Sequence, residues 1–162
     1  MAGPRRDYQA IAQATESYAE RPDQMRAVVD ALWNGLHNAG VSWVGFYIDH
    51  PDQPHDRRMV LGPCRDKPAC SPIGLHGLCG QALISRQVQI VRDVRSLGVN
   101  YIACDPRDRS EIVAPLIDQA GVCWGVLDLD SWEPAAFDEA DAAGLRRVLH
   151  AAGLTAIGLE GT

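Results

Sequence analysis

The stretch EIVAPLIDQAGVCWGVLDLDS, residues 111–131, contains two apolar segments of strand length separated by a short turn with a glycine. The segments EIVAPLID (111–118) and VCWGVLDLDS (122–131) are rich in β-branched residues and predict an antiparallel hairpin. Asp128 and Asp130 lie two residues apart on the second strand, so their side chains point to the same face of the sheet. The hairpin therefore decides both the type of sheet and the face to which two carboxylates belong.

The sequence on either side of the hairpin predicts further strands and helices. VSWVGFYID (41–49) and RRMVLG (57–62) are strand segments joined by a turn with two prolines. Apolar residues at helical spacing predict a helix over 22–39 that Gly40 ends, and Asp138 can cap a long final helix. The remaining predicted elements are a helix at 7–19, a short helix at 80–86 and a strand at 88–94.

These elements predict an α+β fold with a mainly antiparallel central sheet, because most connections are of the hairpin type. We expect the helices to cover one side of that sheet. The chain has 162 residues, which fits one domain, and it contains no internal repeat, low-complexity tract or linker. We therefore expect a single domain over residues 1–162, with about 1–20 as an N-terminal helical segment.

The composition argues against some classes of partner. The formal net charge is −6, so the phosphate backbone of a nucleic acid is not an expected ligand. The N-terminal MAGPRRDYQA has no apolar run after its arginines, and no later run is long enough to span a bilayer. We therefore expect a cytoplasmic protein that does not enter a membrane. Its five cysteines should be free thiols unless they act in catalysis or bind a metal.

Three cysteines lie in segments without regular periodicity. Cys70 and Cys79 are in the proline- and glycine-rich stretch 63–80, and Cys104 is in a second irregular stretch, 95–109. Long irregular loops in a compact domain are usually functional, whereas structural cysteines usually lie on apolar strands or helix faces. This placement makes each of the three thiols a candidate for redox chemistry or metal binding.

The spacing of the cysteines does not suit a metal site. Zinc ligands usually come in close C-x₂₋₄-C pairs, but the cysteines from Cys64 to Cys104 are separated by 6, 9 and 25 positions. In redox chemistry, one thiol is oxidised to a sulfenic acid and a second resolves it to a disulfide, which requires their Cα atoms to come within about 7 Å. Asp105 beside Cys104 does not favour a thiolate, so either Cys104 is unreactive or its substrate supplies the activation that the loop does not.

Glu111, Asp128 and Asp130 are candidates for an acidic pocket. If these carboxylates converge, burial and mutual repulsion raise the pKa of at least one of them. A protonated carboxyl can give a proton to a substrate oxygen, and an ionised one attracts a positive amine. The alternation of the strand equally fits a face in contact with water, so both interpretations remain open from these residues alone.

Two aromatic residues on the predicted strand 41–49 could enclose such a pocket. Trp43 and Tyr47 are four residues apart and share a face, and Gly45 between them leaves open space above the backbone. Aromatic residues on strands most often pack in a core, so the pair fits either a core or a pocket wall.

Five motifs taken together are similar to those of a known family. They are WVGFY (43–47), KPAC (67–70), GLCG (77–80), IACDPRDRSEIVAP (102–115) and GVLDLDS (125–131). Their combination and order resemble the free methionine-(R)-sulfoxide reductases, which are stand-alone GAF-domain enzymes. The resemblance implies a GAF-like fold, a cytoplasmic homodimer and reduction of the R-epimer of free methionine sulfoxide without a bound cofactor, with thioredoxin as the external reductant.

The resemblance also implies distinct roles for the thiols. The cysteine of the CD…RSEI motif is the family's nucleophile, which is Cys104 here. The KPAC cysteine, Cys70, is similar to the main resolving thiol, and the GLCG cysteine, Cys79, to an alternative partner. Which of the two reaches Cys104 first stays open, and Cys64 receives no role.

The family's acidic substrate pocket is implied to consist here of Glu111, Asp128 and Asp130, with Trp43 and Tyr47 enclosing the methyl end of the substrate. In the mechanism that follows from this arrangement, Asp130 or Glu111 protonates the sulfoxide oxygen while the thiol attacks the sulfur. In this mechanism the carboxyls act on the substrate oxygen and amine and do not activate the thiol.

Two other functions fit the same residues. A GAF domain can be a sensor that binds a small molecule without catalysis, and such modules usually lie inside multidomain signalling chains. A thiol protein can also sense peroxide with the same cysteines. Turnover of methionine sulfoxide distinguishes the reductase from both.

Overall fold

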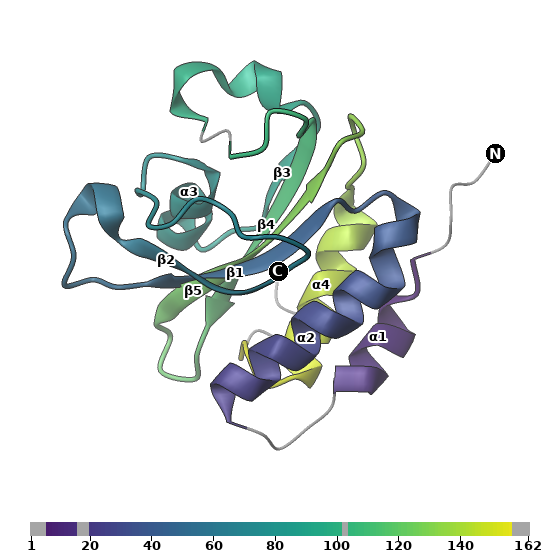
Figure 1. Cartoon of the computed structure of the whole chain (residues 1–162). Helices are drawn as coiled ribbons and strands as arrows, with labels where there is room; N and C mark the ends of the chain where they lie inside the picture. The colour runs from purple at the N-terminus through teal and green to yellow at the C-terminus, as the bar shows by residue number, and fades with distance from the viewer. Residues whose placement is uncertain (1–5, 16–19, 102–103, 157–162) are drawn as a thin grey trace.

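The computed structural model describes residues 6–15, 20–101 and 104–156 (Figure 1). Within these ranges the strands are β1 (Trp43–Asp49), β2 (Met59–Arg65), β3 (Gln89–Val91), β4 (Ser110–Ile117) and β5 (Cys123–Ser131). The α-helices are α1 (Tyr8–Thr15), α2 (Arg21–Leu36), α3 (Leu78–Ser85) and α4 (Glu139–Ala151). Short 3₁₀ segments are η1 (His37–Ala39), η2 (His55–Arg57) and η3 (Val94–Asn100).

The strands form one sheet in the order β2-β1-β5-β4-β3, and every neighbouring pair is antiparallel. The predicted α+β class with an antiparallel central sheet is confirmed, and so is the hairpin of β4 and β5. Its turn is held by Asp118, whose carboxylate accepts hydrogen bonds from the backbone N–H groups of Ala120 and Val122, both at 2.9 Å. Gly121 in this turn has a φ of +83°, which glycine adopts without steric cost.

Helix α1 packs against α2 and α4, which cover one face of the sheet (Figure 1). Their apolar stripes pack on the strand residues that point to this side, because alternate residues of a strand face opposite ways. The cluster is composed of apolar side chains, among them Val28, Leu32, Phe46, Ile112, Leu127, Leu129, Leu145 and Leu149.

The opposite face is covered by α3 and by irregular segments, so the expectation that helices cover only one side was wrong. Leu78, Ala82 and Leu83 of α3 pack with Val113 and Val126 of the sheet in a second buried cluster. The strands carry apolar side chains on both faces, and the second face therefore also needs a cover. The short α3 supplies part of it, and the segment before α3 supplies more.

The two edges of the sheet differ from the predicted strand limits. β2 runs to Arg65 and so includes Pro63, which had been assigned to a loop. An edge strand tolerates a proline, because one side of it has no ladder hydrogen bonds to donate. The predicted loop 63–80 is shorter at its other end as well, since α3 begins at Leu78. At the opposite edge, β3 covers only part of the predicted strand 88–94.

The helix predictions hold with small shifts at the ends. The 22–39 helix ends as α-helix at Leu36, because the next three residues tighten into η1; Gly40 then ends the run with a φ of +95°. Asp138 caps α4 as predicted, in a reciprocal capping box with Asp141. Of the helix predicted at 7–19, residues 8–15 form α1, and residues 16–19 lie outside the described residues.

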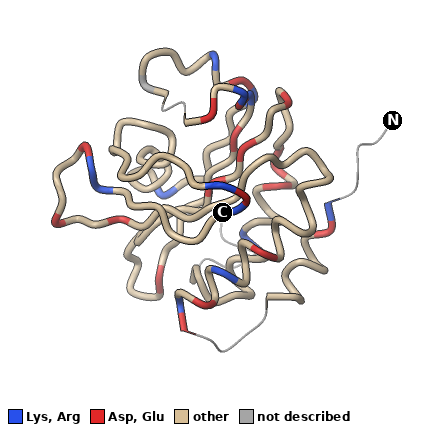
Figure 2. Tube along the Cα trace, viewed as in Figure 1, with Lys and Arg blue, Asp and Glu red and all other residues tan. Residues whose placement is uncertain are grey.

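Basic and acidic residues are scattered along the trace without a continuous basic stripe in the described residues (Figure 2). Among the described residues, we find no helix whose length and apolar character would let it cross a bilayer.

Candidate active site

The register of the sheet aligns the predicted site residues in two rows. Trp43 pairs with Asp130, and Asp130 pairs with Glu111 on its other side. In the next row on the same face, Gly45 pairs with Asp128. Because residues two apart on a strand share a face, all five side-chain positions lie on the side covered by α3.

The position of Trp43 corrects one detail of the sequence analysis. The space above Gly45 is not open, because the indole ring of Trp43 lies over it; a methyl group at Gly45 would overlap that ring. Trp43 and Tyr47 are both buried, with ring centroids 6.2 Å apart. Gly45 therefore leaves room for the indole ring of Trp43. The rings of Trp43 and Tyr47 together form one wall of the site.

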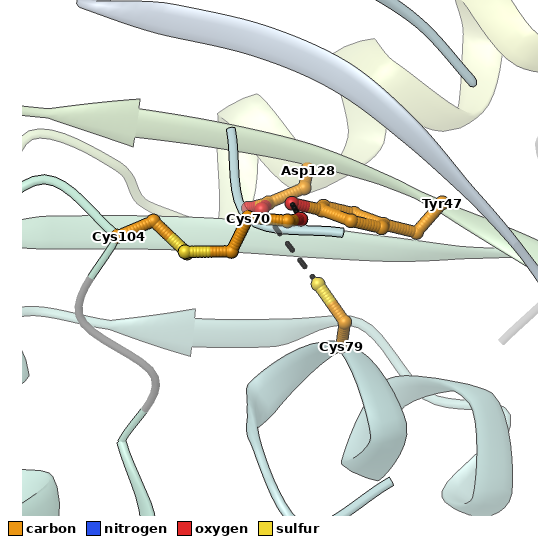
Figure 3. The surroundings of a disulfide bond; sticks show 5 residues. All are labelled: Tyr47, Cys70, Cys79, Cys104 and Asp128. Atoms are coloured by element: carbon orange, nitrogen blue, oxygen red, sulfur yellow. Dashed lines mark hydrogen bonds between the residues drawn. A yellow bond between two sulfur atoms is a disulfide. The ribbon is translucent and has the colours of Figure 1, made fainter. Parts of the chain in front are cut away.

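Both aromatic residues also hold the segment that carries Cys70. The indole Nε1 of Trp43 donates to the backbone carbonyl of Lys67 at 2.8 Å, and the Tyr47 hydroxyl donates to the carbonyl of Cys70 at 2.8 Å. Cys70 is joined to Cys104 by a disulfide, with a Cα–Cα distance of 5.6 Å (Figure 3). Both cysteines are exposed, so the disulfide is accessible to a reductant.

These elements enclose a cavity between the sheet, α3 and the two irregular segments. All of the predicted site residues line it except Cys70, which reaches its rim through the disulfide. The lining consists of Trp43, Tyr47, Ala69, Ile73, Leu78, Cys79, Tyr101, Cys104, Asp108, Glu111, Asp128 and Asp130. One wall is aromatic and apolar, the floor is acidic, and a sulfur atom lies at the opening.

The acidic floor is kept largely uncharged by its surroundings. Burial raises the pKa of Glu111 well above its usual range, and the neighbouring Asp128 and Asp130 raise it further. The pKa of Asp130 is raised in the same way, first by burial and then by Asp128. Burial raises the pKa of Asp128 to about 6, although hydrogen bonds from Glu111 and Cys79 favour its charged form. Near neutral pH the floor therefore holds protonated carboxyls that can donate, beside one carboxylate.

Cys79 occupies a different environment from the disulfide pair. It lies in the first turn of α3, is buried, and its Sγ donates to Oδ2 of Asp128 at 3.6 Å (Figure 3). Burial and the nearby carboxyls raise the pKa of this thiol well above its usual value. A thiol that stays protonated is a poor nucleophile, so its surroundings do not favour a resolving role.

Known proteins are similar to this chain in sequence and in fold. A family model described as the GAF domain matches residues 19–155. The free methionine-R-sulfoxide reductase of Saccharomyces cerevisiae is 34% identical over 120 residues, and that of Escherichia coli is 40% identical over 111. The chain belongs to the GAF domain family and, within it, to the free methionine-R-sulfoxide reductases.

The extent of these matches is as follows. The aligned parts cover 72% and 67% of this chain, but 65% and 62% of the yeast and E. coli proteins, which is slightly less than two thirds of each. A crystal structure of the free methionine-R-sulfoxide reductase from Neisseria meningitidis in complex with its substrate is 31% identical. It superposes with a TM-score of 0.77, covering 90% of this chain and 83% of that chain.

Two polar residues of the lining, Asp108 and Tyr101, were not predicted from the sequence. Asp108 is buried, and burial followed by the charge of Asp105 raises its pKa to about 7. Tyr101 lies at the rim, where burial raises the pKa of its hydroxyl, so the hydroxyl keeps its proton. Asp108 lies in a run of charged loop residues, where nothing in the sequence separates a buried acid from an exposed one. Residues 102 and 103 of the motif lie outside the described residues.

Three side chains of the cavity have the geometry to hold a metal ion. One ligand atom each from Cys79, Glu111 and Asp128 lies within 4.8 Å of the others. The search for close cysteine pairs missed this set, because its members come from three separate elements. Cys79 Sγ donates to Oδ2 of Asp128, whereas Oδ1 of Asp128 is buried and has no hydrogen-bond partner among the described residues.

Proposed function

We propose that the protein reduces free L-methionine-(R)-sulfoxide to methionine. The observation that carries the proposal is a cavity with an exposed thiol position, Cys104, at its opening and protonated carboxyls on its floor. A sulfoxide needs both, because its oxygen must be protonated as its sulfur is attacked. The names of the relatives and the substrate complex of the Neisseria protein support the same assignment.

In the proposed complex, the substrate lies with its ammonium group towards Asp128, the carboxyl with the lowest pKa among the three on the floor. The methyl end packs against Trp43 and Tyr47, whose rings form the apolar wall. The sulfoxide oxygen accepts a proton from Glu111 or Asp130. Donation by either residue is favourable because its raised pKa keeps the proton available at neutral pH.

The chemical step transfers one oxygen atom. The Sγ of Cys104 attacks the sulfur of the protonated sulfoxide and ends as a sulfenic acid that carries the substrate oxygen. The substrate sulfur gains two electrons and leaves as the thioether of methionine. The carboxyl that gives its proton to the sulfoxide oxygen becomes a carboxylate, and the proton released by the Cys104 thiol reprotonates it, so the site returns to its original protonation state.

Resolution follows at the edge of the cavity. The thiol of Cys70 attacks the sulfenic sulfur of Cys104, water leaves, and the disulfide seen in the structure is the product. We propose that thioredoxin then reduces this exposed disulfide, and that no bound cofactor is needed because the electrons pass through thiols alone. Cys79 would act only as a hydrogen-bond donor to Asp128.

The remaining expectations are also proposals. We propose that the chain is a single domain over residues 1–162, that it works as a homodimer and that it resides in the cytoplasm. The family resemblance supports the dimer, and a thiol-dependent cycle requires a compartment that keeps cysteines reduced.

A coupled assay tests this function. NADPH consumption is followed with thioredoxin and thioredoxin reductase, in parallel reactions with free methionine-R-sulfoxide, the S-epimer and hydrogen peroxide. We expect turnover with the R-epimer at least about a hundredfold faster than with the S-epimer, because the proton donors are fixed on one side of the cavity. Faster turnover of peroxide would favour the peroxide sensor, and binding without turnover of any of the three would favour the ligand-binding sensor.

A further inference from the structure

The residue that follows Cys104 joins three parts of the chain. The carboxylate of Asp105 accepts a hydrogen bond from Lys67 Nζ at 2.8 Å, and Arg107 Nη2 donates to it at 3.0 Å. The indole Nε1 of Trp132, just after β5, donates to it at 3.3 Å. Asp105 is not among the residues that line the cavity described above, but it lines a small adjoining pocket with Lys67 and Cys104.

Lys67 connects Asp105 to the segment that carries the other half of the disulfide. It lies three residues before Cys70. Its backbone carbonyl accepts hydrogen bonds from Trp43 Nε1 and, at 3.5 Å, from Cys64 Sγ. Its side chain then reaches Asp105. A chain of contacts therefore runs from the sheet through Lys67 to the residue next to Cys104.

The other side of Asp105 is fixed to the end of β5. Arg107 donates to the carboxylate through Nε as well, at 3.0 Å, and its guanidinium lies 4.0 Å from the ring centre of Trp132. The Asp105 side chain is 15% exposed, although Lys67 and Arg107 are more exposed. The hydrogen bonds from Arg107 and then from Lys67 hold its pKa well below the usual range. The carboxylate is therefore charged wherever the protein functions, and its charge is compensated.

We propose that Asp105 is a positioning residue for disulfide formation: by bridging Lys67 to Arg107 and Trp132, it holds the Cys104 segment against the Cys70 segment. We call these four residues the clasp. The effect of the clasp on turnover rests on the proposed function. Its effect on the equilibrium between the Cys70–Cys104 disulfide and the two thiols does not. The clasp also explains why an acidic residue can follow Cys104. The negative charge of Asp105 is compensated by Lys67 and Arg107 and is not directed at the sulfur atom.

The clasp has a measurable consequence for the disulfide. Two thiols that are held near one another form a disulfide more readily, because less freedom is lost when the bond closes. The reaction to be followed is protein disulfide plus two glutathione thiols giving protein dithiol plus glutathione disulfide. Without the clasp, we expect the equilibrium to shift towards the dithiol by about tenfold, which corresponds to about 30 mV for this two-electron couple.

The test uses Asp105→Asn, which keeps the shape of the side chain and removes its charge. The variant and the parent are equilibrated in glutathione redox buffers, and the Cys70 and Cys104 thiols are counted by alkylation and mass spectrometry. Lys67→Met removes only the bridge to the Cys70 segment and leaves the pair of Asp105 and Arg107 intact. The control is Asp23→Asn, which breaks a comparable pair with Arg26 on α2, 2.9 Å long and far from the disulfide.

We expect both clasp variants to shift the equilibrium by about tenfold and the double variant to shift it little further, because the two residues act through one contact. The control should match the parent. If Asp105→Asn and Lys67→Met both stay within about twofold of the parent, or if their effects simply add, the proposal is wrong. Melting temperatures identify a variant that is unfolded, and the exposed Lys67 provides a test even if Asp105→Asn does not fold.

A second readout links the clasp to turnover. With methionine-R-sulfoxide as oxidant, Asp105→Asn should lower kcat and KM together and leave kcat/KM within about twofold, because the slowed step follows oxygen transfer. The Cys104 sulfenic acid then accumulates and becomes trappable by dimedone. An unchanged amount of trapped sulfenic acid would contradict the positioning role. The glutathione equilibrium contains no methionine sulfoxide, so a failure of the proposed function would appear in the turnover assay alone and would leave the clasp result standing.

Discussion

The two faces of the sheet are built for different purposes. Strand β5 shows the contrast within four residues, since Leu127 and Leu129 are buried under the helices while Asp128 and Asp130 face the cavity. The buried cluster on the helix-covered face is apolar. The other face brings carboxyls together under a short helix and two irregular segments. Because successive side chains of a strand point to opposite faces, one strand can place apolar residues under the helices and carboxyls in the cavity.

The two kinds of side chain that alternate along β5 contribute burial free energies of opposite sign. Burial of each large aliphatic side chain contributes about 1.5–3 kcal/mol. Burial of a carboxyl costs free energy unless the group is neutralised or paired, and the raised pKa values of Glu111 and Asp130 are the form that this cost takes. The helix-covered face therefore supplies stability that allows the cavity face to hold buried carboxyls where a substrate can contact them. This contrast leads to four predictions.

Loss of the nucleophile should have the largest effect. We expect Cys104→Ser to lower turnover of free methionine-R-sulfoxide by more than about a thousandfold, because a hydroxyl does not accept the oxygen atom. The measurement is NADPH consumption with thioredoxin and its reductase. Cys123→Ser, at a half-buried cysteine outside the cavity, is the matched control and should keep its activity. Activity in the Cys104 variant at the parent's rate would remove this residue from the mechanism.

Removal of one proton donor should lower the rate without loss of the fold. For Asp130→Asn we expect kcat to fall by about a hundredfold, with a much smaller change in KM, because the amide cannot protonate the sulfoxide. Steady-state kinetics at several substrate concentrations separate the two parameters. An equal change confined to KM would make Asp130 a binding group only, and unchanged kinetics would assign the proton to Glu111.

A substitution on the helix-covered face should give the converse result. Leu127 is fully buried, and we expect Leu127→Ala to lower the free energy of unfolding by about 2–5 kcal/mol. Urea denaturation measures this loss, while kcat of the folded protein at 25 °C should stay within about twofold of the parent. If the variant loses activity in proportion to stability, the two faces are not independent.

The smallest expected effect concerns pH and Asp108. Its pKa is about 7 in the folded protein, against an ordinary value of 3.8, so the folded state binds more protons than the unfolded state between these values. Stability from this group is therefore lost as pH rises from about 4 to 7. Asp108→Asn should be more stable than the parent at pH 8, by on the order of 2 kcal/mol, and this advantage should vanish near pH 4.

Urea unfolding of both proteins across this range measures the difference. Asp118→Asn, at an acid in the exposed end of the β4–β5 hairpin, is a suitable comparison, since any effect there comes from turn hydrogen bonds and not from burial. A constant difference between parent and Asp108→Asn from pH 4 to 8 would mean that Asp108 does not titrate as its burial indicates.

Local patterns were sufficient for most of the fold. The β4–β5 hairpin, the end of the 22–39 helix at Gly40 and the cap at Asp138 each depend on a few adjacent residues, and all were predicted. The errors were at Pro63, which an edge strand accommodates, and at α3, which covers the second face. Both errors concern the neighbours of a segment in the folded structure. The residues adjacent in sequence do not determine these neighbours.

The site divides in the same way. Alternation along β5 placed Asp128 and Asp130 on one face, and the spacing in β1 placed Trp43 and Tyr47 together, because the geometry of a strand is local. Whether that face was wet or enclosed could not be read from alternation. Asp108 escaped notice entirely, since its burial results from the return of a distant loop over the sheet.

The sequence by itself determined which residue types are available and which face each strand residue takes, since propensity, capping and the two-residue period act over a few positions. Only the tertiary structure decided that Cys70 meets Cys104, that Cys79 donates to Asp128 instead, and that Lys67 holds Asp105. These pairings join segments 34 or more positions apart. Their geometry depends on how the loops settle on the sheet, which is set by packing, charge compensation and burial acting together.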